Sequence, residues 1–169
     1  WNGLTVTEAR KENMSFSESY IKNMQVVVVK ADNAAKFTST ESLAGASLTA
    51  EISSAGETAI KDDPNLGKAT YTAMAKQTDA LLEVKAGTAD ACVLDYVLAK
   101  AMVGPGTDYA DLQIIDGLEL SVEEYAIGFR LGSNMVEKAN GAIDELIKDG
   151  TLDAIAEKYD LTASLLSNQ

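Results

Sequence analysis

The chain is poor in the residues that most often carry out chemistry. It contains no histidine and a single cysteine, Cys92, among 169 residues. A lone cysteine cannot form an intramolecular disulfide, and without histidine it has no imidazole to act as its base. Cys92 lies in an apolar run, which is typical of a small buried hydrophobic residue rather than a nucleophile. No set of residues in the sequence therefore indicates catalysis.

Positive charge and long apolar segments are also scarce. The chain has 14 Lys and Arg residues against 26 Asp and Glu residues, for a net charge of −12. No basic stripe is available to neutralise phosphates, so nucleic acid is not an expected partner. The longest apolar runs, such as 25–29 and 91–94, are far shorter than the ~18 residues that a membrane-spanning helix requires.

Apolar, β-branched runs alternate with amphipathic segments over the first two thirds of the chain. This alternation predicts βα units, a mostly parallel sheet and an α/β fold class. We expect strands at 24–29, 48–52, 70–73 and 89–94. We expect helices at 38–44, 56–62, 78–86 and 96–102, with Gly87 ending the third of them.

The last third of the chain has a different pattern. Strands are expected at 112–115 and 125–129, separated by an acidic connector that holds Glu119, Glu123 and Glu124. Such carboxylates are normally solvated, although they could attract a cationic group of a ligand. Ser133 is expected to cap a long helix that Gly150 closes, and a further helix follows from 151 to about 159.

A small polar turn and a helix start occupy the first ten residues. Thr7 stands where a helix N-cap is expected, so Arg10 falls in the first helical turn beside free backbone groups. The planar guanidinium matches a carboxylate with two parallel hydrogen bonds, which suits a small organic acid. Taken alone, the same residues also fit an Asn-Gly turn followed by a helix with a solvent-exposed arginine.

Two further polar features follow expected strands. Asp95 ends the strand at 89–94, and open α/β sheets bind ligands at the carboxyl ends of their strands. Asp95 also fits an N-cap of the next helix. The Ser-Ser-Ala-Gly segment 53–56 lies between a strand and a helix, where free N–H groups can bind a carboxylate. Its plain alternative is a strand-to-helix turn with serine capping.

The first twenty residues, W-N-G-L-T-V-T-E-A-R-K-E-N-M-S-F-S-E-S-Y, resemble a family motif. They are similar to the G-(M/L/I)-T-(I/V)-T-x-x-R-K…(F)-(S/T)-x-x-Y stretch of bacterial extracellular solute-binding proteins for polar amino acids, the type II receptors of ABC importers. Six further blocks follow in the order of that family, at 24–29, 43–45, 53–57, 87–95, 124–130 and 149–153. The series extends over essentially the whole chain.

The resemblance implies a two-lobed type II periplasmic-binding-protein fold. Residues 24–120 correspond to a complete lobe 2, and residues 1–23 and 121–169 correspond to a partial lobe 1. The start shows no initiator Met and no signal peptide, and the resemblance implies that two βα units of lobe 1 are missing upstream. A broken lobe would expose apolar surface, so self-association of the chain through that lobe is a hypothesis.

The resemblance implies ligand-binding roles for four residues of the first block. Arg10 corresponds to the partner of the ligand's α-carboxylate. Thr5 corresponds to a hydroxyl that contacts the α-groups, and Gly3 to a backbone carbonyl that accepts from the α-ammonium. Asn2 would lie at the rim of the pocket. Ordinary turn chemistry is the alternative for Asn2, Gly3 and Thr5.

Three further residues receive roles from the later blocks. Asp95 corresponds to the aspartate that binds the ligand's α-ammonium. Ser54 would offer a hydroxyl, and Ala55 its backbone N–H, to the carboxylate. The family usually has Gly-(Ser/Thr)-(Ser/Thr) where this chain has Ser-Ser-Ala at 53–55. The backbone donor at position 55 survives this change, whereas the hydroxyl is lost.

By resemblance, the function is that of a substrate-binding component of an ABC importer. It would capture a polar amino acid between two hinged lobes and deliver it to a membrane permease, with no cofactor or metal ion. The expected location is extracellular or periplasmic, with a lipoprotein anchor on the full-length form. A periplasmic dehydratase-like enzyme and an extracellular sensor domain are alternatives on the same fold. Which amino acid binds is not readable, because the aromatic residues around the ligand's side chain lie largely upstream.

Overall fold

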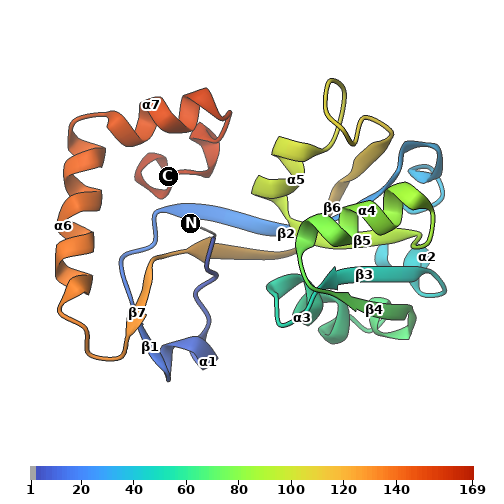
Figure 1. Cartoon of the computed structure of the whole chain (residues 1–169), viewed down its shortest axis with the longest axis horizontal. Helices are drawn as coiled ribbons and strands as arrows, with labels where there is room; N and C mark the ends of the chain where they lie inside the picture. Colours follow the sequence, from blue (N-terminus) through green and yellow to red (C-terminus); the bar gives the residue numbers. More distant parts are fainter. Residues whose placement is uncertain (1–2) are drawn as a thin grey trace. The chain divides into compact units, whose positions relative to one another are not determined.

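The computed structural model describes residues 3–169 and confirms the α/β fold class. The chain divides into two compact units (Figure 1). Unit 1 combines the residues up to Asn23 with Glu123–Gln169, and unit 2 is Met24–Val122. The chain passes from one unit to the other within two strands, β2 (Ile21–Lys30) and β6 (Leu112–Tyr125). The predicted lobe boundaries, 24–120, end two residues before unit 2 does, and the assignment of these units to lobes stays a prediction.

A five-stranded sheet with the order β4-β3-β5-β2-β6 forms the centre of unit 2. Strand β3 (Ser47–Glu51) pairs in parallel with both β4 (Thr70–Met74) and β5 (Ala91–Asp95). Strand β2 pairs antiparallel with β5, so the sheet is mixed. Because β3, β4 and β5 run the same way, their carboxyl ends meet at one edge of the sheet.

Both faces of this sheet are covered. Val27 and Val29 of β2 belong to one buried cluster, whereas Val26 and Val28 belong to another. Successive residues of a strand point to opposite faces, so a strand buried on both sides reads as a continuous apolar run. This packing explains the four consecutive valines of β2.

The helices of unit 2 begin and end where local chemistry favours it. They are the 3₁₀ helices η1 (Ala31–Asn33) and η2 (Leu66–Lys68) and the α-helices α2 (Thr40–Leu43), α3 (Ala55–Asp62), α4 (Gln77–Ala86) and α5 (Tyr96–Met102). Ser39 caps α2 through a capping box. Gly87 ends α4 with φ +80°, a left-handed conformation that glycine adopts without steric cost.

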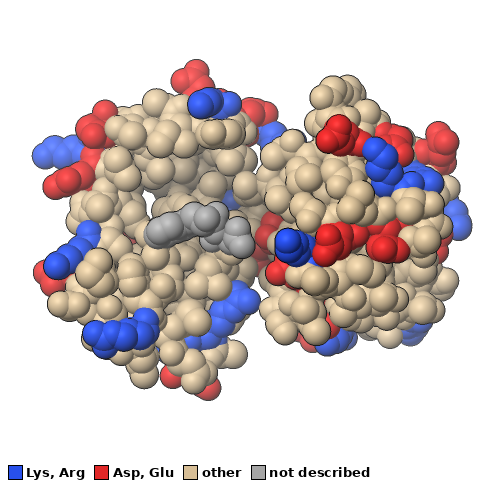
Figure 2. Space-filling view, viewed as in Figure 1, with Lys and Arg blue, Asp and Glu red and all other residues tan. Residues whose placement is uncertain are grey.

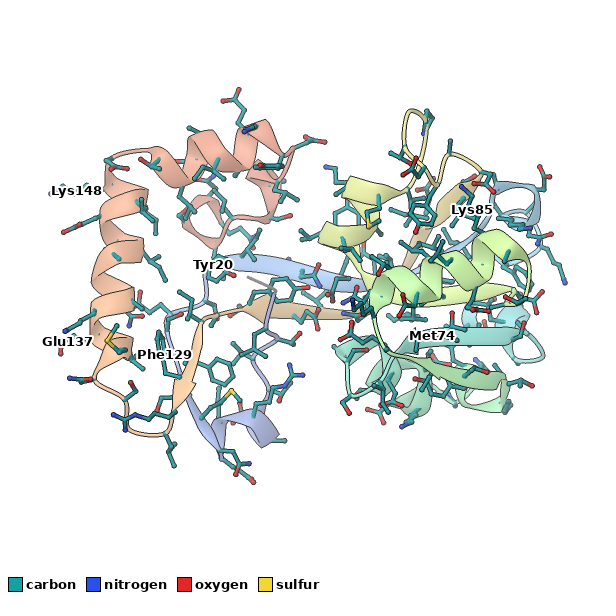
Figure 3. The ribbon with its side chains drawn as sticks, viewed as in Figure 1. Tyr20, Met74, Lys85, Phe129, Glu137 and Lys148 are labelled. Carbon is teal, nitrogen blue, oxygen red and sulfur yellow. The ribbon has the colours of Figure 1, made fainter. Side chains whose placement is uncertain are left out.

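Unit 1 contains a small sheet and a helical C-terminal part. After α1 (Glu8–Lys11), strand β1 (Met14–Phe16) pairs antiparallel with β7 (Gly128–Arg130). The C-terminal part consists of α6 (Met135–Lys148), α7 (Thr151–Lys158), η3 (Thr162–Ser164) and η4 (Leu166–Asn168). Figure 3 shows Glu137 and Lys148 of α6 projecting away from the rest of unit 1.

The prediction of two strands joined by an acidic connector is wrong for residues 112–125. They form a single strand, β6, and the acidic connector expected between two strands does not exist. Burial alternates at the end of β6: Glu124 is exposed, whereas Glu123 and Tyr125 are buried. Because a strand alternates its faces, acidic residues can line one face without interrupting it. The strand expected at 125–129 is also displaced, since β7 begins at Gly128.

The start of α6 also differs from the prediction. Asn134 occupies the N-cap position, one residue after the expected Ser133, and its side chain makes no capping hydrogen bond. The Ser133 Oγ accepts a hydrogen bond from the Met135 N–H at 3.2 Å. At the other end Asp149 is the C-cap, and Gly150, with φ +77°, precedes α7.

Candidate functional site

Arg10 lies in α1 of unit 1, where Thr7 forms the predicted N-cap. The Thr7 side chain accepts the Arg10 backbone N–H at 3.2 Å. The Arg10 guanidinium donates from Nη1 to the carbonyl oxygen of Thr5 at 2.8 Å, so the side chain folds back on the preceding turn. A guanidinium has five N–H donors and stays charged at all relevant pH values. Unit 1 therefore brings Thr5 and Arg10 together.

Thr5 belongs to a buried polar cluster that sequence reasoning missed. Its Oγ1 donates to Oε2 of Glu123 at 3.1 Å, and Asn23 Nδ2 donates to Oε1 of the same carboxylate at 2.5 Å. Thr5 and Glu123 are both 8% exposed, so the expectation that Glu123 is solvated is wrong. The sequence did contain a signal of this burial. Residues two apart in a strand lie on the same face, so Glu123 shares its face with the buried Tyr125.

Gly3 packs closely against an aromatic ring. A Cβ atom added at Gly3 would lie 2.2 Å from a ring carbon of Tyr125. Only glycine fits this approach, which keeps the backbone near Tyr125. The role predicted for the Gly3 carbonyl stays a prediction, and Asn2 lies outside the described residues.

The 53–56 turn of unit 2 follows β3 and leads into α3. Ser53 has φ +60°, a left-handed conformation that is uncommon for serine. Ser54 is the N-cap of α3, and its Oγ accepts the Glu57 N–H at 3.1 Å. The serine-capping interpretation is thus confirmed. A hydroxyl that accepts this bond keeps its proton to donate, and Ala55 is the first residue of α3.

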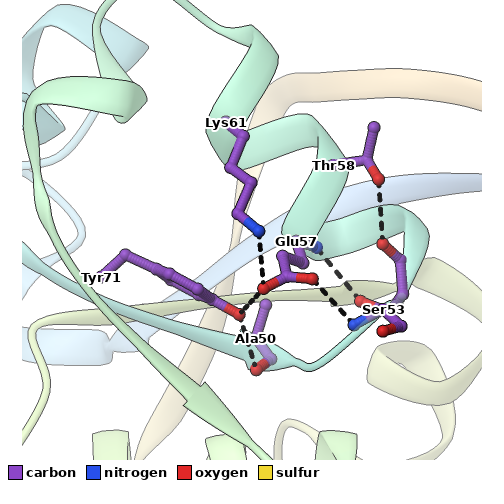
Figure 4. A network of polar contacts seen from close by, with 7 residues as sticks. Ala50, Ser53, Glu57, Thr58, Lys61 and Tyr71 are labelled. Carbon is purple, nitrogen blue, oxygen red and sulfur yellow. Dashed lines mark hydrogen bonds and ion pairs between the residues drawn. The ribbon is translucent and has the colours of Figure 1, made fainter.

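Glu57 holds this turn in place (Figure 4). Its Oε2 accepts the Ser53 N–H at 2.8 Å, and its Oε1 accepts from Lys61 Nζ at 2.9 Å and from the Tyr71 hydroxyl at 3.1 Å. The hydrogen bonds from Lys61 and from the Ser53 N–H lower the pKa of Glu57. Burial, and then the Glu57 carboxylate, raises the pKa of Tyr71 to about 12. At neutral pH this pair is therefore a carboxylate that accepts from a protonated tyrosine.

Asp95 is the last residue of β5 and occupies the N-cap position of α5, but its side chain makes no capping hydrogen bond. The capping alternative is therefore wrong for the side chain. Instead, its carboxylate oxygens accept from two glutamine amides. Gln25 Nε2 donates to Oδ1 at 2.6 Å, and Gln77 Nε2 donates to Oδ2 at 2.5 Å.

The turn and Asp95 lie at the same edge of the sheet in unit 2, because β3 and β5 are parallel and both end there. A Cβ added at Gly56 would lie 2.9 Å from the Val93 carbonyl oxygen and 2.9 Å from Gln25 Oε1. The beginning of α3 thus packs directly on β5 and on the glutamine that holds Asp95. This edge is where open α/β sheets bind ligands.

Cys92 is buried and takes no part in these contacts. Burial raises the pKa of its thiol, which disfavours the reactive thiolate.

No cluster of three or more metal-ligating side chains occurs between residues 3 and 169. Over the same residues, no helix is long and apolar enough to cross a membrane. On the visible face in Figure 2, charged side chains of both signs are interspersed.

Residues 1–162 match the family described as bacterial extracellular solute-binding proteins, family 3. The chain belongs to this family, as its motifs predict.

Among curated proteins, it is 27% identical over 161 residues to the arginine-binding extracellular protein ArtP of Bacillus subtilis (strain 168), covering 94% of this chain and 61% of ArtP. It is 31% identical over 165 residues to the probable amino-acid-binding protein YxeM of the same organism, covering 94% of this chain and 60% of YxeM. The chain therefore spans about 60% of the length of these relatives.

Solved structures agree on the fold. A P235GK mutant of ArgBP from T. maritima has a TM-score of 0.82 and 35% identity, over 93% of this chain and 66% of that one. The ancestral amino acid-binding protein AncCDT-1, a precursor of cyclohexadienyl dehydratase, has a TM-score of 0.80 and 29% identity, over 93% of this chain and 65% of that one. The predicted type II periplasmic-binding-protein fold is confirmed by these similarities.

Proposed function

We propose that this protein is the substrate-binding component of an ABC importer and that it captures a polar amino acid for delivery to a membrane permease. The observation that carries the proposal is the family match over residues 1–162. Relatives named as arginine-binding, glutamine-binding and cystine-binding proteins support an amino acid as the ligand class. Neither a cofactor nor a metal ion is part of the proposal.

A site for a zwitterionic amino acid needs a positive group for the α-carboxylate and a negative group for the α-ammonium. We assign the α-carboxylate to Arg10, with Ser54 and the Ala55 N–H as further donors. We assign the α-ammonium to the Asp95 carboxylate and the Gly3 carbonyl. The Thr5 hydroxyl would contact the α-groups, and Asn2 would lie at the rim. Support comes from the way each charged group is oriented within its own unit: Arg10 by the Thr5 carbonyl, and Asp95 by two amides.

The proposed motion is hinge closure around the ligand. The permease would recognise the closed form of the protein. The chain crosses between the two units at only two places in the described part, after Asn23 and after Val122. A hinge consists of a few residues that absorb a large change in backbone angles, and we propose that these residues lie at the two crossings. We place the protein outside the cytoplasmic membrane, as the family name states, and propose a lipoprotein anchor on the full-length form.

Substitution of the two charged residues tests the site in the full-length polypeptide. Arg10→Ala and Asp95→Ala should each cost about 2–5 kcal/mol of binding, because each leaves a desolvated ligand charge unpaired. This loss is roughly 30-fold to several thousand-fold in affinity. Titration calorimetry with L-arginine, L-glutamine and L-cystine measures it. Lys11→Ala and Asp116→Ala remove exposed charges of the same signs and should change affinity by less than about twofold. If Arg10→Ala or Asp95→Ala binds with an affinity within a few-fold of that of the unaltered protein, the residue it replaces is not part of the site.

The proposal that the protein is not an enzyme has its own test, since one similar structure is a precursor of a dehydratase. Incubation with amino acids or with prephenate-like acids should leave them unchanged, while the true ligand raises the melting temperature. Mass spectrometry follows the compounds. Turnover that disappears in Asp95→Asn would overturn the receptor proposal in favour of the dehydratase.

We also propose that the 169-residue chain self-associates through unit 1. Several large apolar side chains of that unit are exposed, among them Leu131, Met135 and Ile155. Exposed apolar patches favour association between copies. Light scattering of the 169-residue chain over a concentration series should show species larger than a monomer, and a monodisperse monomer at every concentration would contradict the proposal.

A further inference from the structure

Asp95 is the centre of a polar network at the carboxyl edge of the unit 2 sheet. Four chain segments contribute to it: the end of β3 through Glu51, the start of α4 through Gln77, β5 through Asp95, and β2 through Gln25. A helix cap or a turn involves only residues that are neighbours in the sequence, whereas this network joins four separate segments. Its arrangement is suited to holding the carboxylate of Asp95 in one orientation.

Gln77 is fixed at both its backbone and its side chain. Its backbone N–H donates to Glu51 Oε2 at 3.1 Å. Its side-chain amide makes two bonds to one residue, because Nε2 donates to Asp95 Oδ2 while Oε1 accepts the Asp95 N–H at 3.0 Å. This reciprocal pair sets the orientation of the amide, since the reversed amide would place its oxygen against the carboxylate. Gln77 thereby fixes the position of Oδ2 relative to the backbone of Asp95.

Gln25 holds the other oxygen from a buried position. It lies on β2 directly opposite Asp95 and is 1% exposed. A buried amide is costly unless it is hydrogen-bonded, and its Nε2 donates to Asp95 Oδ1. Hydrogen bonds to an ionised acceptor are about twice as strong as neutral ones. The two glutamines therefore restrain both oxygens of one carboxylate.

The chemistry of these donors matters as much as their geometry. An amide donates a hydrogen bond but adds no formal charge, whereas a lysine or arginine in its place would form an ion pair with Asp95. Such a cation would compete with a cationic ligand group for the same carboxylate. Amide donors therefore orient the carboxylate without adding a competing cation.

We propose that Gln25 and Gln77 are positioning residues that hold Asp95 for the α-ammonium group of the ligand. This inference rests on the proposed function, because it assumes an amino-acid ligand at Asp95. It adds that affinity for the ammonium depends on two neutral side chains outside the predicted site residues. It also explains why Asp95 does not cap α5.

The test compares two ligands that differ only at the α-position. The probe is whichever of L-arginine, L-glutamine and L-cystine the full-length polypeptide binds most tightly, together with the 2-hydroxy acid that carries hydroxyl in place of each α-ammonium. Gln77→Met keeps the volume of the side chain and removes its hydrogen bonds. We expect it to weaken the amino acid about tenfold and the hydroxy acid less than about twofold.

Two controls separate positioning from general destabilisation. Gln113→Met changes an exposed glutamine of β6 and should leave both affinities unchanged. In an Asp95→Asn background, Gln77→Met should have no further effect on the amino acid, because the charge that it positions is gone. Gln25→Met is the second test variant, and thermal unfolding checks that each variant folds.

The outcomes distinguish this inference from the proposed function. If the unaltered protein binds neither these three nor any other polar amino acid, the proposed function itself is overturned; another polar amino acid that it binds becomes the probe. If it binds one, and Gln77→Met weakens the amino acid and the hydroxy acid equally or changes neither, only the positioning role is overturned. Selective loss of the amino acid, absent in the Asp95→Asn background, supports it.

Discussion

The two units differ in how fully their apolar side chains are buried. Unit 2 has buried clusters on both faces of its sheet, centred on alternating valines of β2. In unit 1, the 14-residue helix α6 has no buried residue, although its apolar residues recur at helical spacing. Exposed apolar side chains of unit 1 include Leu131, Met135, Leu146, Ile155 and Tyr159. Periodicity in the sequence therefore predicts where the apolar face of a helix lies, whereas the burial of that face depends on what packs against it.

The largest expected effect comes from a matched pair of leucines. Leu81 of α4 is fully buried, and Leu146 of α6 is 39% exposed. Leu81→Ala should cost about 2–5 kcal/mol of unfolding free energy, because it removes buried contacts and leaves a cavity. Leu146→Ala should cost less than about 1 kcal/mol. Urea unfolding followed by circular dichroism, at a concentration where the chain is monomeric, measures both. Equal losses would mean that α6 is covered even in the monomer.

A second pair concerns adjacent glutamates of β6. Glu123→Ala should cost about 1–3 kcal/mol, because it leaves the buried Thr5 hydroxyl and the Asn23 amide without this acceptor. Glu124→Ala, on the exposed face, should change stability by less than about 0.5 kcal/mol. The same unfolding assay applies. Similar values for the two variants would restore the interpretation of this segment as a solvated connector.

Glycine substitutions should move the stability of the two units in opposite directions. Gly141 lies within α6 with nothing within 4 Å of an added Cβ, so Gly141→Ala should stabilise by about 0.5–1 kcal/mol. At Gly56 the added Cβ would meet the Val93 carbonyl oxygen at 2.9 Å, so Gly56→Ala should destabilise. Thermal unfolding reports both changes. A destabilising Gly141→Ala would show that another surface packs closely on α6.

The smallest expected effect is acid sensitivity. Hydrogen bonds from Lys61 and the Ser53 N–H lower the pKa of Glu57 in unit 2 below its ordinary value of 4.5. Hydrogen bonds from Thr151 lower the pKa of Asp149 in unit 1 below 3.8. Each ionised group therefore stabilises the fold above those values, and the stabilisation is lost as the pH falls through the folded-state pKa. Glu57→Gln and Asp149→Asn should each flatten the decline of melting temperature between about pH 5 and pH 2. An unchanged decline would contradict the assignment.

Much of the fold could be predicted from the sequence because the evidence was local. The four valines of β2, the Thr7 cap and the glycine after α4 each act within a few residues of the chain. The same holds for the family motifs, which name Arg10 and Asp95 without any knowledge of their neighbours. Periodicity failed at β6, where charged residues on one face of a strand resemble a loop.

By itself, the sequence determined the fold class, the family and the types of residue at the candidate site. Only the tertiary structure decided which groups meet: Thr5 with Glu123 across 118 positions, and Asp95 with Gln25 across 70. The physical reason is that a hydrogen bond between distant segments depends on strand register and direction, and no local pattern encodes them. Whether an apolar face is buried is decided in the same way, by the segments that fold against it.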